Sequence, residues 1–199
     1  MNLTPVLVAA GVVFLAELGD KSQLMALAMA AKHKARDVFI GMFVAILIMF
    51  AIAVGLGAVL GSVLDEYRRV ITIAAGLIFL GFAVWTVMDR DDDDEHDLDD
   101  VDPVAAGAGS RTVITAAFTA FVVAELGDKT QLASATLAMR EGFWPVYIGS
   151  VVGEVAAIGL AIVVGAVAGK HLPQKLIVFG AAALFAVFGI IMIIQGIRG

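Results

Sequence analysis

Apolar residues along this chain fall into six long blocks separated by short polar stretches. The blocks cover residues 5–31, 38–64, 70–88, 112–139, 146–169 and 176–197. Each block has 19 to 28 residues, enough for a helix to cross a hydrocarbon layer about 30 Å thick. Backbone groups at that depth must bond to one another, and the alternation typical of barrel strands is absent. The pattern therefore predicts an all-α polytopic membrane protein with six transmembrane helices.

The chain carries the same unit twice. AELGDKSQL occupies residues 16–24 and AELGDKTQL occupies residues 124–132, so eight of nine positions are identical at an offset of 108 residues. Three predicted spans in each half is an odd number, which makes the second half insert upside down. We therefore expect two inverted three-helix repeats, residues 1–88 and 112–199, joined by a linker at 89–111. The first block continues through charged residues into further apolar sequence, so we expect a retained span rather than a cleaved signal.

Composition strengthens this prediction, because 61% of the residues are hydrophobic against about 45–50% in soluble domains. Such a chain is neither a soluble enzyme nor a nucleic-acid binder. It contains no cysteine, which excludes a disulfide scaffold and a thiolate metal site. Of the net charge of −6, residues 89–102 supply −9, as expected of a solvated linker. Lysine and arginine are more frequent in the predicted loops on the linker's side, which favours a cytoplasmic linker and termini outside.

Each repeat places charged residues in the middle of its first span. They are Glu17, Asp20 and Lys21 in the first half, and Glu125, Asp128 and Lys129 in the second. A charge at that depth costs about 2.5–3.5 kcal/mol, so a set that occurs twice indicates a functional site. On a continuous helix these residues share one face, beside the oxygen-bearing side chains of Ser22, Gln23, Thr130 and Gln131. Inversion of the repeats lets the two faces meet, which predicts one shared site near the midplane.

Two features of the motifs admit a second interpretation. Glu17 and Lys21, like Glu125 and Lys129, lie four residues apart, so the charges could be helical ion pairs that only ease insertion. That interpretation leaves the two aspartates without partners. Gly19 and Gly127 either break the helix and free carbonyl oxygens toward the site, or allow close helix packing.

The residue types of the motif indicate what the site binds. Carboxylate, amide and hydroxyl oxygens suit Mg²⁺, Ca²⁺ and Mn²⁺, and carboxylates also bind protons. A site that holds either a metal ion or protons is the simplest basis for antiport. A passive divalent-cation channel and an exporter of small organic solutes are the alternatives, although the motif lysines would repel cations in an open pore. No nucleophile–base pair lies at this depth, so we expect no enzyme, no cofactor and no nucleic-acid partner.

The motifs ELGDKS and ELGDKT both fit a duplicated E-x-G-D-(K/R)-(S/T) signature. In this the chain resembles the family of small membrane cation exchangers that includes bacterial MneA-type manganese exporters and GDT-type Golgi and chloroplast Ca²⁺/Mn²⁺ transporters. The resemblance implies Ca²⁺/Mn²⁺:H⁺ exchange, with manganese export from the inner (plasma) membrane in a bacterial member. It assigns the acidic positions to Glu17, Asp20, Glu125 and Asp128, and the basic and hydroxyl positions to Lys21, Ser22, Lys129 and Thr130.

Two further features lie outside the motifs. Glu154 is a single acid in the fifth predicted span, and its repeat equivalent is Ile46. It could add a metal ligand or pass protons, or it could face a wet cavity. The pairs Gly57/Gly61, Gly149/Gly153 and Gly165/Gly169 have the spacing of close helix contacts, which favours packing within the chain and leaves a homodimer face as the alternative.

Overall fold

A computed structural model gives the fold of the chain, and it describes residues 3–18, 20–63, 68–88, 108–167 and part of 183–197. Within these ranges the helices with defined bounds are, in chain order, α1 (Thr4–Glu17), α2 (Lys21–Lys32), α3 (Ala35–Val63), α4 (Arg68–Met88), α5 (Ser110–Glu125), α6 (Lys129–Glu141) and α7 (Phe143–Val167). The described residues of the last predicted span are also helical. Residues 89–107 of the predicted linker and residues 168–182 lie outside the description.

Two of the predicted spans are broken, which corrects the expectation of continuous helices at 5–31 and 112–139. The first block forms α1 and α2, and the fourth forms α5 and α6, which meet at an angle of 70°. The backbone turns at the Glu-Leu-Gly-Asp sequence of each motif, as described below. In contrast, α3 and α7 are unbroken helices long and apolar enough to cross a membrane.

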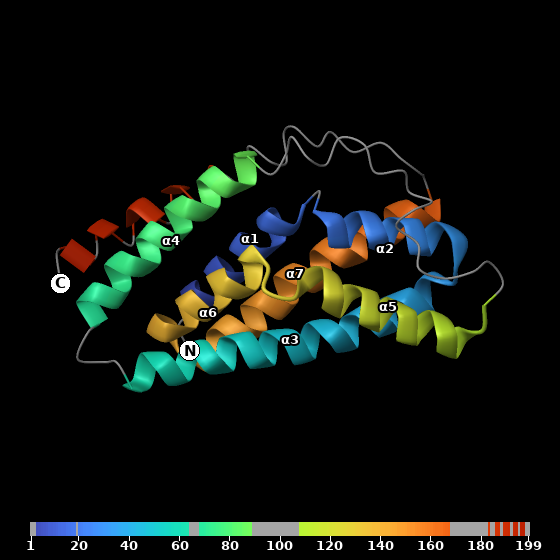
Figure 1. The fold of residues 1–199 in the computed structure, drawn as a ribbon, viewed down its shortest axis with the longest axis horizontal. Helices are drawn as coiled ribbons and strands as arrows, with labels where there is room; N and C mark the ends of the chain where they lie inside the picture. Colours follow the sequence, from blue (N-terminus) through green and yellow to red (C-terminus); the bar gives the residue numbers. More distant parts are fainter. Residues whose placement is uncertain are drawn as a thin grey trace.

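Each half of the chain packs its broken helix against the long helix of the other half. The pair α1 and α2 lies along α7, and the pair α5 and α6 lies along α3 (Figure 1). The contacts repeat at the sequence offset: a Cβ added at Gly41 would overlap the carbonyl oxygen of Ile114, and one added at Gly149 would overlap that of Val6. The duplicated sequence thus makes duplicated contacts between its halves.

The glycine pairs serve this packing. Gly57 lies against the backbone of Ala135, Gly61 against Met139, and Gly153 against Ala10. Packing within the chain is therefore confirmed for the pairs 57/61 and 149/153, while the surroundings of residues 165 and 169 lie outside the description. Close approach of backbones is the means by which helices associate where no water drives them together.

The outer faces of the long helices are apolar and exposed, as a bilayer requires. Large hydrophobic side chains on α3 and α7 are about half exposed or more, among them Ile52, Leu56, Val152 and Val163. Exposed apolar surface on this scale is a lipid or partner contact in a folded protein. Away from them, α4 lies beside the described residues of the last span, where Gly76 and Gly189 are in contact (Figure 1).

Candidate metal centre

Each motif breaks its helix at a tight turn, and the turn of the second motif is described in full. Leu126 has φ −65° and ψ 107°, Gly127 has φ 82°, and the Asp128 amide donates to the Glu125 carbonyl at 3.0 Å. These are the features of a type II turn, whose third residue needs a positive φ and is therefore usually glycine. Leu18 has the same conformation, with φ −62° and ψ 113°, and the Asp20 amide donates to the Glu17 carbonyl at 3.1 Å.

Gly127 thus breaks the helix, as one of the two interpretations held, whereas Gly19 lies outside the described residues. The break corrects the expectation that each motif forms one helical face. Glu125 is the last residue of α5 and Lys129 the first of α6, so a bonded helical turn does not join them. Helical i,i+4 ion pairing is for this reason not the arrangement adopted in the second motif.

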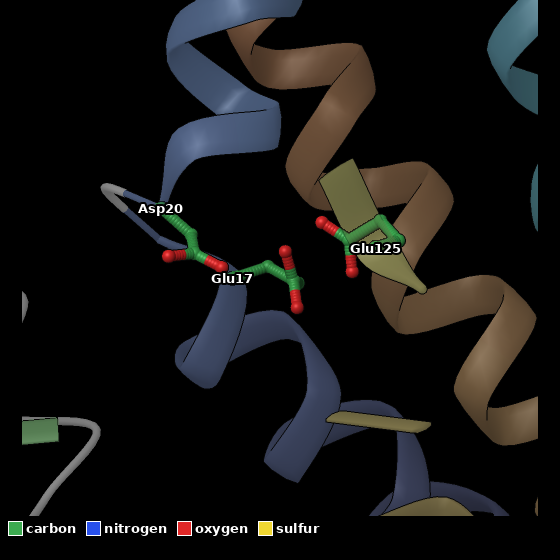
Figure 2. Close-up of side chains that lie close together, drawn as sticks. All are labelled: Glu17, Asp20 and Glu125. Atoms are coloured by element: carbon green, nitrogen blue, oxygen red, sulfur yellow. The ribbon is translucent and has the colours of Figure 1, made fainter. Parts of the chain in front are cut away.

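Three carboxylates from the two halves converge at the breaks. One oxygen from each of Glu17, Asp20 and Glu125 lies within 4.8 Å of the other two (Figure 2). Glu17 is fully buried and Glu125 is 3% exposed. Buried acids are normally paired or bound to a cation, because an isolated buried charge is very costly. The three oxygens therefore form a set of hard ligands of the kind that could hold Ca²⁺ or Mn²⁺.

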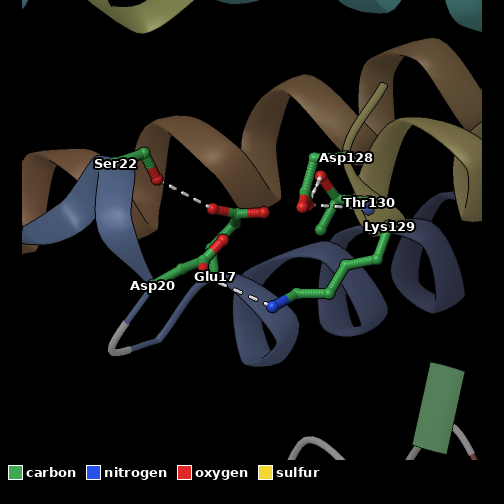
Figure 3. Close-up of polar contacts among 6 residues, drawn as sticks. All are labelled: Glu17, Asp20, Ser22, Asp128, Lys129 and Thr130. Carbon is green, nitrogen blue, oxygen red and sulfur yellow. Dashed lines mark hydrogen bonds and ion pairs between the residues drawn. The ribbon is translucent and has the colours of Figure 1, made fainter. Parts of the chain in front are cut away.

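Side chains of both motifs contact this acidic cluster (Glu17, Asp20 and Glu125). Lys129 places its Nζ 3.4 Å from Oδ1 of Asp20, which joins the second half to the first (Figure 3). The Ser22 hydroxyl donates to Oε2 of Glu17 at 3.1 Å, while Oε1 of Glu17 has no hydrogen-bond partner among the described residues. A buried oxygen without a donor is a position that a cation or a proton could occupy.

Asp128, the equivalent of Asp20, has a different environment. Its Oδ2 accepts hydrogen bonds from the amide of Thr130 at 3.2 Å and from the Thr130 hydroxyl at 3.3 Å (Figure 3). This caps the N-terminus of α6. Asp128 lies outside the group of three converging carboxylates, so the two equivalent aspartates have different arrangements.

The two motif glutamines reach the long helix of the opposite half. The Gln23 amide donates to the carbonyl of Ala157 on α7 at 3.0 Å. The Gln131 amide lies 3.9 Å from the sulfur of Met49 on α3 and donates to the Glu125 carbonyl at 2.8 Å. Met49 and Ala157 are equivalent at the 108-residue offset. In this structure the amide nitrogens of the glutamines therefore position the broken helices.

The remaining predicted residues are Glu154 and Lys21. Glu154 is fully buried in the middle of α7, and neither of its oxygens has a hydrogen-bond partner among the described residues. The side chain of Lys21 lies outside the description. Sequence reasoning missed a buried hydroxyl pair, Ser134 and Ser150, whose oxygens are 2.8 Å apart. The available signal was that both are polar where the other repeat is apolar.

We predict that Gly127→Ala weakens the site without removing any proposed ligand. A non-glycine residue at φ 82° costs about 1–2 kcal/mol, although a Cβ at Gly127 would meet no atom within 4 Å. The turn should open and shift Glu125, which lowers the apparent affinity for Mn²⁺ measured by titration. Gly11→Ala, in a helix with open space, is the control. Unchanged Mn²⁺ affinity in Gly127→Ala would contradict this role of the turn.

Comparison with known proteins identifies a family and several relatives of the chain. The family model described as "Divalent cation/proton antiporter GDT1" matches residues 5–94 and 113–199. The chain is 31% identical over 203 residues to "Protein PAM71, chloroplastic" of Arabidopsis thaliana, which covers 92% of this chain and 55% of that protein. It is 30% identical over 178 residues to a "Putative manganese exporter" of Vibrio cholerae, which covers 87% of this chain and 82% of that protein.

The chain thus spans little more than half of the chloroplast relative and most of the bacterial one. No solved structure was found to match it. The family model matches one segment in each half, which agrees with a duplication, and the family is one of membrane transporters rather than enzymes. Both motifs lie within the matched segments. The chain is an integral membrane protein that belongs to the GDT1 family of divalent cation/proton antiporters.

Proposed function

We propose that this protein is a secondary transporter that exports Mn²⁺, or Ca²⁺, in exchange for protons. The metal site consists of Glu17, Asp20, Glu125 and Asp128. The observation that carries the proposal is the convergence of three carboxylates, two buried and that of Asp20 partly buried, within 4.8 Å of one another and from both halves of the chain. A metal bound there touches both repeats, so its binding is sensitive to their relative position.

The transmembrane arrangement belongs to the same proposal. Residues 1–88 and 112–199 each cross the bilayer three times, in opposite orientations, with the acidic linker 89–111 between them. The broken helix of each half packs on the long helix of the other half: α1 and α2 on α7, and α5 and α6 on α3. This reciprocal packing supports two equivalent halves. The linker is cytoplasmic and both termini are outside, in the inner membrane of a bacterium, where the protein acts as a monomer or a homodimer.

The unequal aspartates support a mechanism of alternating access. Asp20 lies in the acidic cluster and Asp128 caps its own helix. Since the motifs are nearly identical in sequence, each is able to adopt either arrangement. Exchange of the two arrangements, as one half rocks against the other, would open the site to the opposite side. Asp128 then joins the cluster when Asp20 becomes the cap.

Competition between metal and protons couples their movement. When ionised, the four acids exceed the charge of Lys129 and Lys21 by two, and one divalent cation or two protons neutralise that excess. Two neighbouring carboxylates do not both stay ionised readily without a cation, so departure of the metal favours proton uptake. Mn²⁺ is placed first because the bacterial relative is named a manganese exporter, and oxygen ligands accept Ca²⁺ as well.

Purified protein in liposomes tests the proposal. With a pH gradient across the membrane, we expect Mn²⁺ to move toward the acidic side while protons move the other way, each followed with a dye. Mn²⁺ flux that ignores the gradient and moves no protons would identify a passive channel instead. Absence of both Mn²⁺ and Ca²⁺ flux, with transport of an organic solute, would overturn the proposed substrate class.

A further inference from the structure

Glu154 is the least expected buried group in the described structure. It lies in the middle of α7, fully buried, and neither carboxylate oxygen has a hydrogen-bond partner among the described residues. Leaving a buried polar group unsatisfied costs about 1–3 kcal/mol, and more for a charged one. An ionisable residue within a membrane-spanning segment usually has a functional role.

The converging metal ligands do not include Glu154. One oxygen from each of Glu17, Asp20 and Glu125 meets the others within 4.8 Å, whereas Glu154 does not join that group. Four acids still act on it electrostatically: Glu125, Asp20, Asp128 and Glu17. Among the described side chains, Lys129 brings a positive charge to this network, where it pairs with Asp20. Glu154 is therefore close enough to respond to the metal site without being one of its converging ligands.

Two serines, one on α7 and one on α6, lie beyond Glu154. Ser150 precedes Glu154 by one helical turn, about 6 Å of rise, which places both on the same helix face. The Ser150 hydroxyl lies 2.8 Å from that of Ser134 on α6, and both serines are buried. These three residues, which we name the polar row, extend from the level of the motifs toward the connection between α6 and α7.

The polar row exists in only one of the two repeats. At the 108-residue offset, the equivalents of Ser134, Ser150 and Glu154 are Ala26, Met42 and Ile46. All three equivalents are buried and apolar, so packing at these positions does not require a polar side chain. The metal motif is duplicated and the polar row is not, which indicates a task that the transporter performs on one side only.

We infer that Glu154 is the proton-carrying residue of the exchange, separate from the metal ligands, and that Ser150 and Ser134 deliver protons to it. The inference rests on the proposed function. Each serine hydroxyl accepts a proton on one side as it donates its own on the other, so the serines end unchanged. Ser150 and Glu154 are not hydrogen-bonded to each other in this structure, so the last transfer runs through a water molecule between them. The Glu154 carboxylate gains the proton from outside as the metal leaves, and releases it to the cytoplasmic side before the next metal binds. In the proposed orientation, the connection between α6 and α7 faces outside, from which protons enter.

The experiment separates metal movement from proton coupling. Wild type and Glu154→Gln are reconstituted in liposomes for two measurements: exchange of labelled for unlabelled Mn²⁺ at equal pH, and net Mn²⁺ movement driven by a pH gradient. Exchange at equal pH needs no net proton transfer. We expect Glu154→Gln to keep exchange within about twofold, and to lose gradient-driven movement and its proton flux by about tenfold or more. Glu154→Asp should restore part of the coupling.

Two results would overturn the inference. One is gradient-driven Mn²⁺ movement in Glu154→Gln at the wild-type rate, and the other is loss of exchange together with coupling in folded protein, which would make Glu154 a metal ligand. Failure of the proposed function is distinct, because wild type itself would then show no proton-coupled Mn²⁺ movement.

Matched serine variants test the rest of the polar row. Ser150→Ala and Ser134→Ala should slow gradient-driven movement several-fold and leave exchange unchanged. The control is Thr136→Val on α6, because the Thr136 hydroxyl is also buried but donates to the carbonyl of Leu132 in its own helix at 2.7 Å. Equal coupling in the serine variants and the Thr136 variant would remove the serines from the path.

Discussion

Replacing Glu17 or Glu125 with glutamine should abolish Mn²⁺ transport, with a loss of about 100-fold or more. Both carboxylates are buried and converge on one point from the two halves of the chain. Glutamine has nearly the same shape but no charge, so each variant removes half of the charge that a divalent cation would neutralise. At position 17 it also keeps an oxygen that accepts from the Ser22 hydroxyl, which holds the local structure.

The measurement is Mn²⁺ flux in liposomes, together with Mn²⁺ binding to the purified variant. Asp37→Asn is the matched control, since Asp37 is a buried acid at the start of α3 outside the acidic cluster. We expect it to transport at the wild-type rate. Normal flux in either glutamate variant would mean that the motif acids only pair with lysines to ease insertion, and the shared site would be wrong.

Replacing Gly57 with alanine should destabilise the protein more than other single-methyl changes. A Cβ at Gly57 would overlap the backbone of Ala135 on α6, which is part of the broken helix of the opposite half. Alanine is favoured over glycine by about 1 kcal/mol of helix propensity. Overpacking costs about 1–3 kcal/mol, and we expect the upper end of that range here because the added Cβ meets backbone atoms. We expect a net loss of about 2 kcal/mol, a fall in Tm of about 4–8 °C.

The measurement is thermal unfolding of the purified protein in detergent. Gly159→Ala provides the comparison, because Gly159 also lies within a long helix but has no atom within 4 Å of an added Cβ. Its Tm should be unchanged or slightly raised. A Gly57→Ala protein as stable as wild type would show that α3 and α6 separate without loss, contrary to the packing described here.

The sequence by itself determined that the chain belongs in a membrane, and it predicted the residues to which the chemistry is here assigned. Helix length, the need for internal backbone hydrogen bonds and the cost of buried charge are all local properties, so runs of apolar residues and the duplicated motif were enough to predict them. The same reasoning singled out Glu154 as a lone acid in the fifth span. It also predicted packing within the chain at Gly57/Gly61 and Gly149/Gly153, which the contacts confirm.

The sequence left undecided whether the helix breaks at the motif. Glycine suits both a turn with positive φ and a close helix contact, and a sequence pattern does not distinguish them. The turn at Gly127 decides the outcome, and it removes the helical face on which the motif residues were expected to align. A 70° bend between α5 and α6 changes which side chains are neighbours.

Only the tertiary structure decided the partners across the two halves. Lys129 pairs with Asp20 rather than along its own helix, and Asp128 caps α6 while its equivalent joins the acidic cluster. The tertiary structure also brings the hydroxyl of Ser134 on α6 next to that of Ser150 on α7. These contacts join residues whose distance depends on how separate helices cross. Helix crossing is set by backbone approach at glycines such as Gly41 and Gly149, and not by the spacing of residues along the chain.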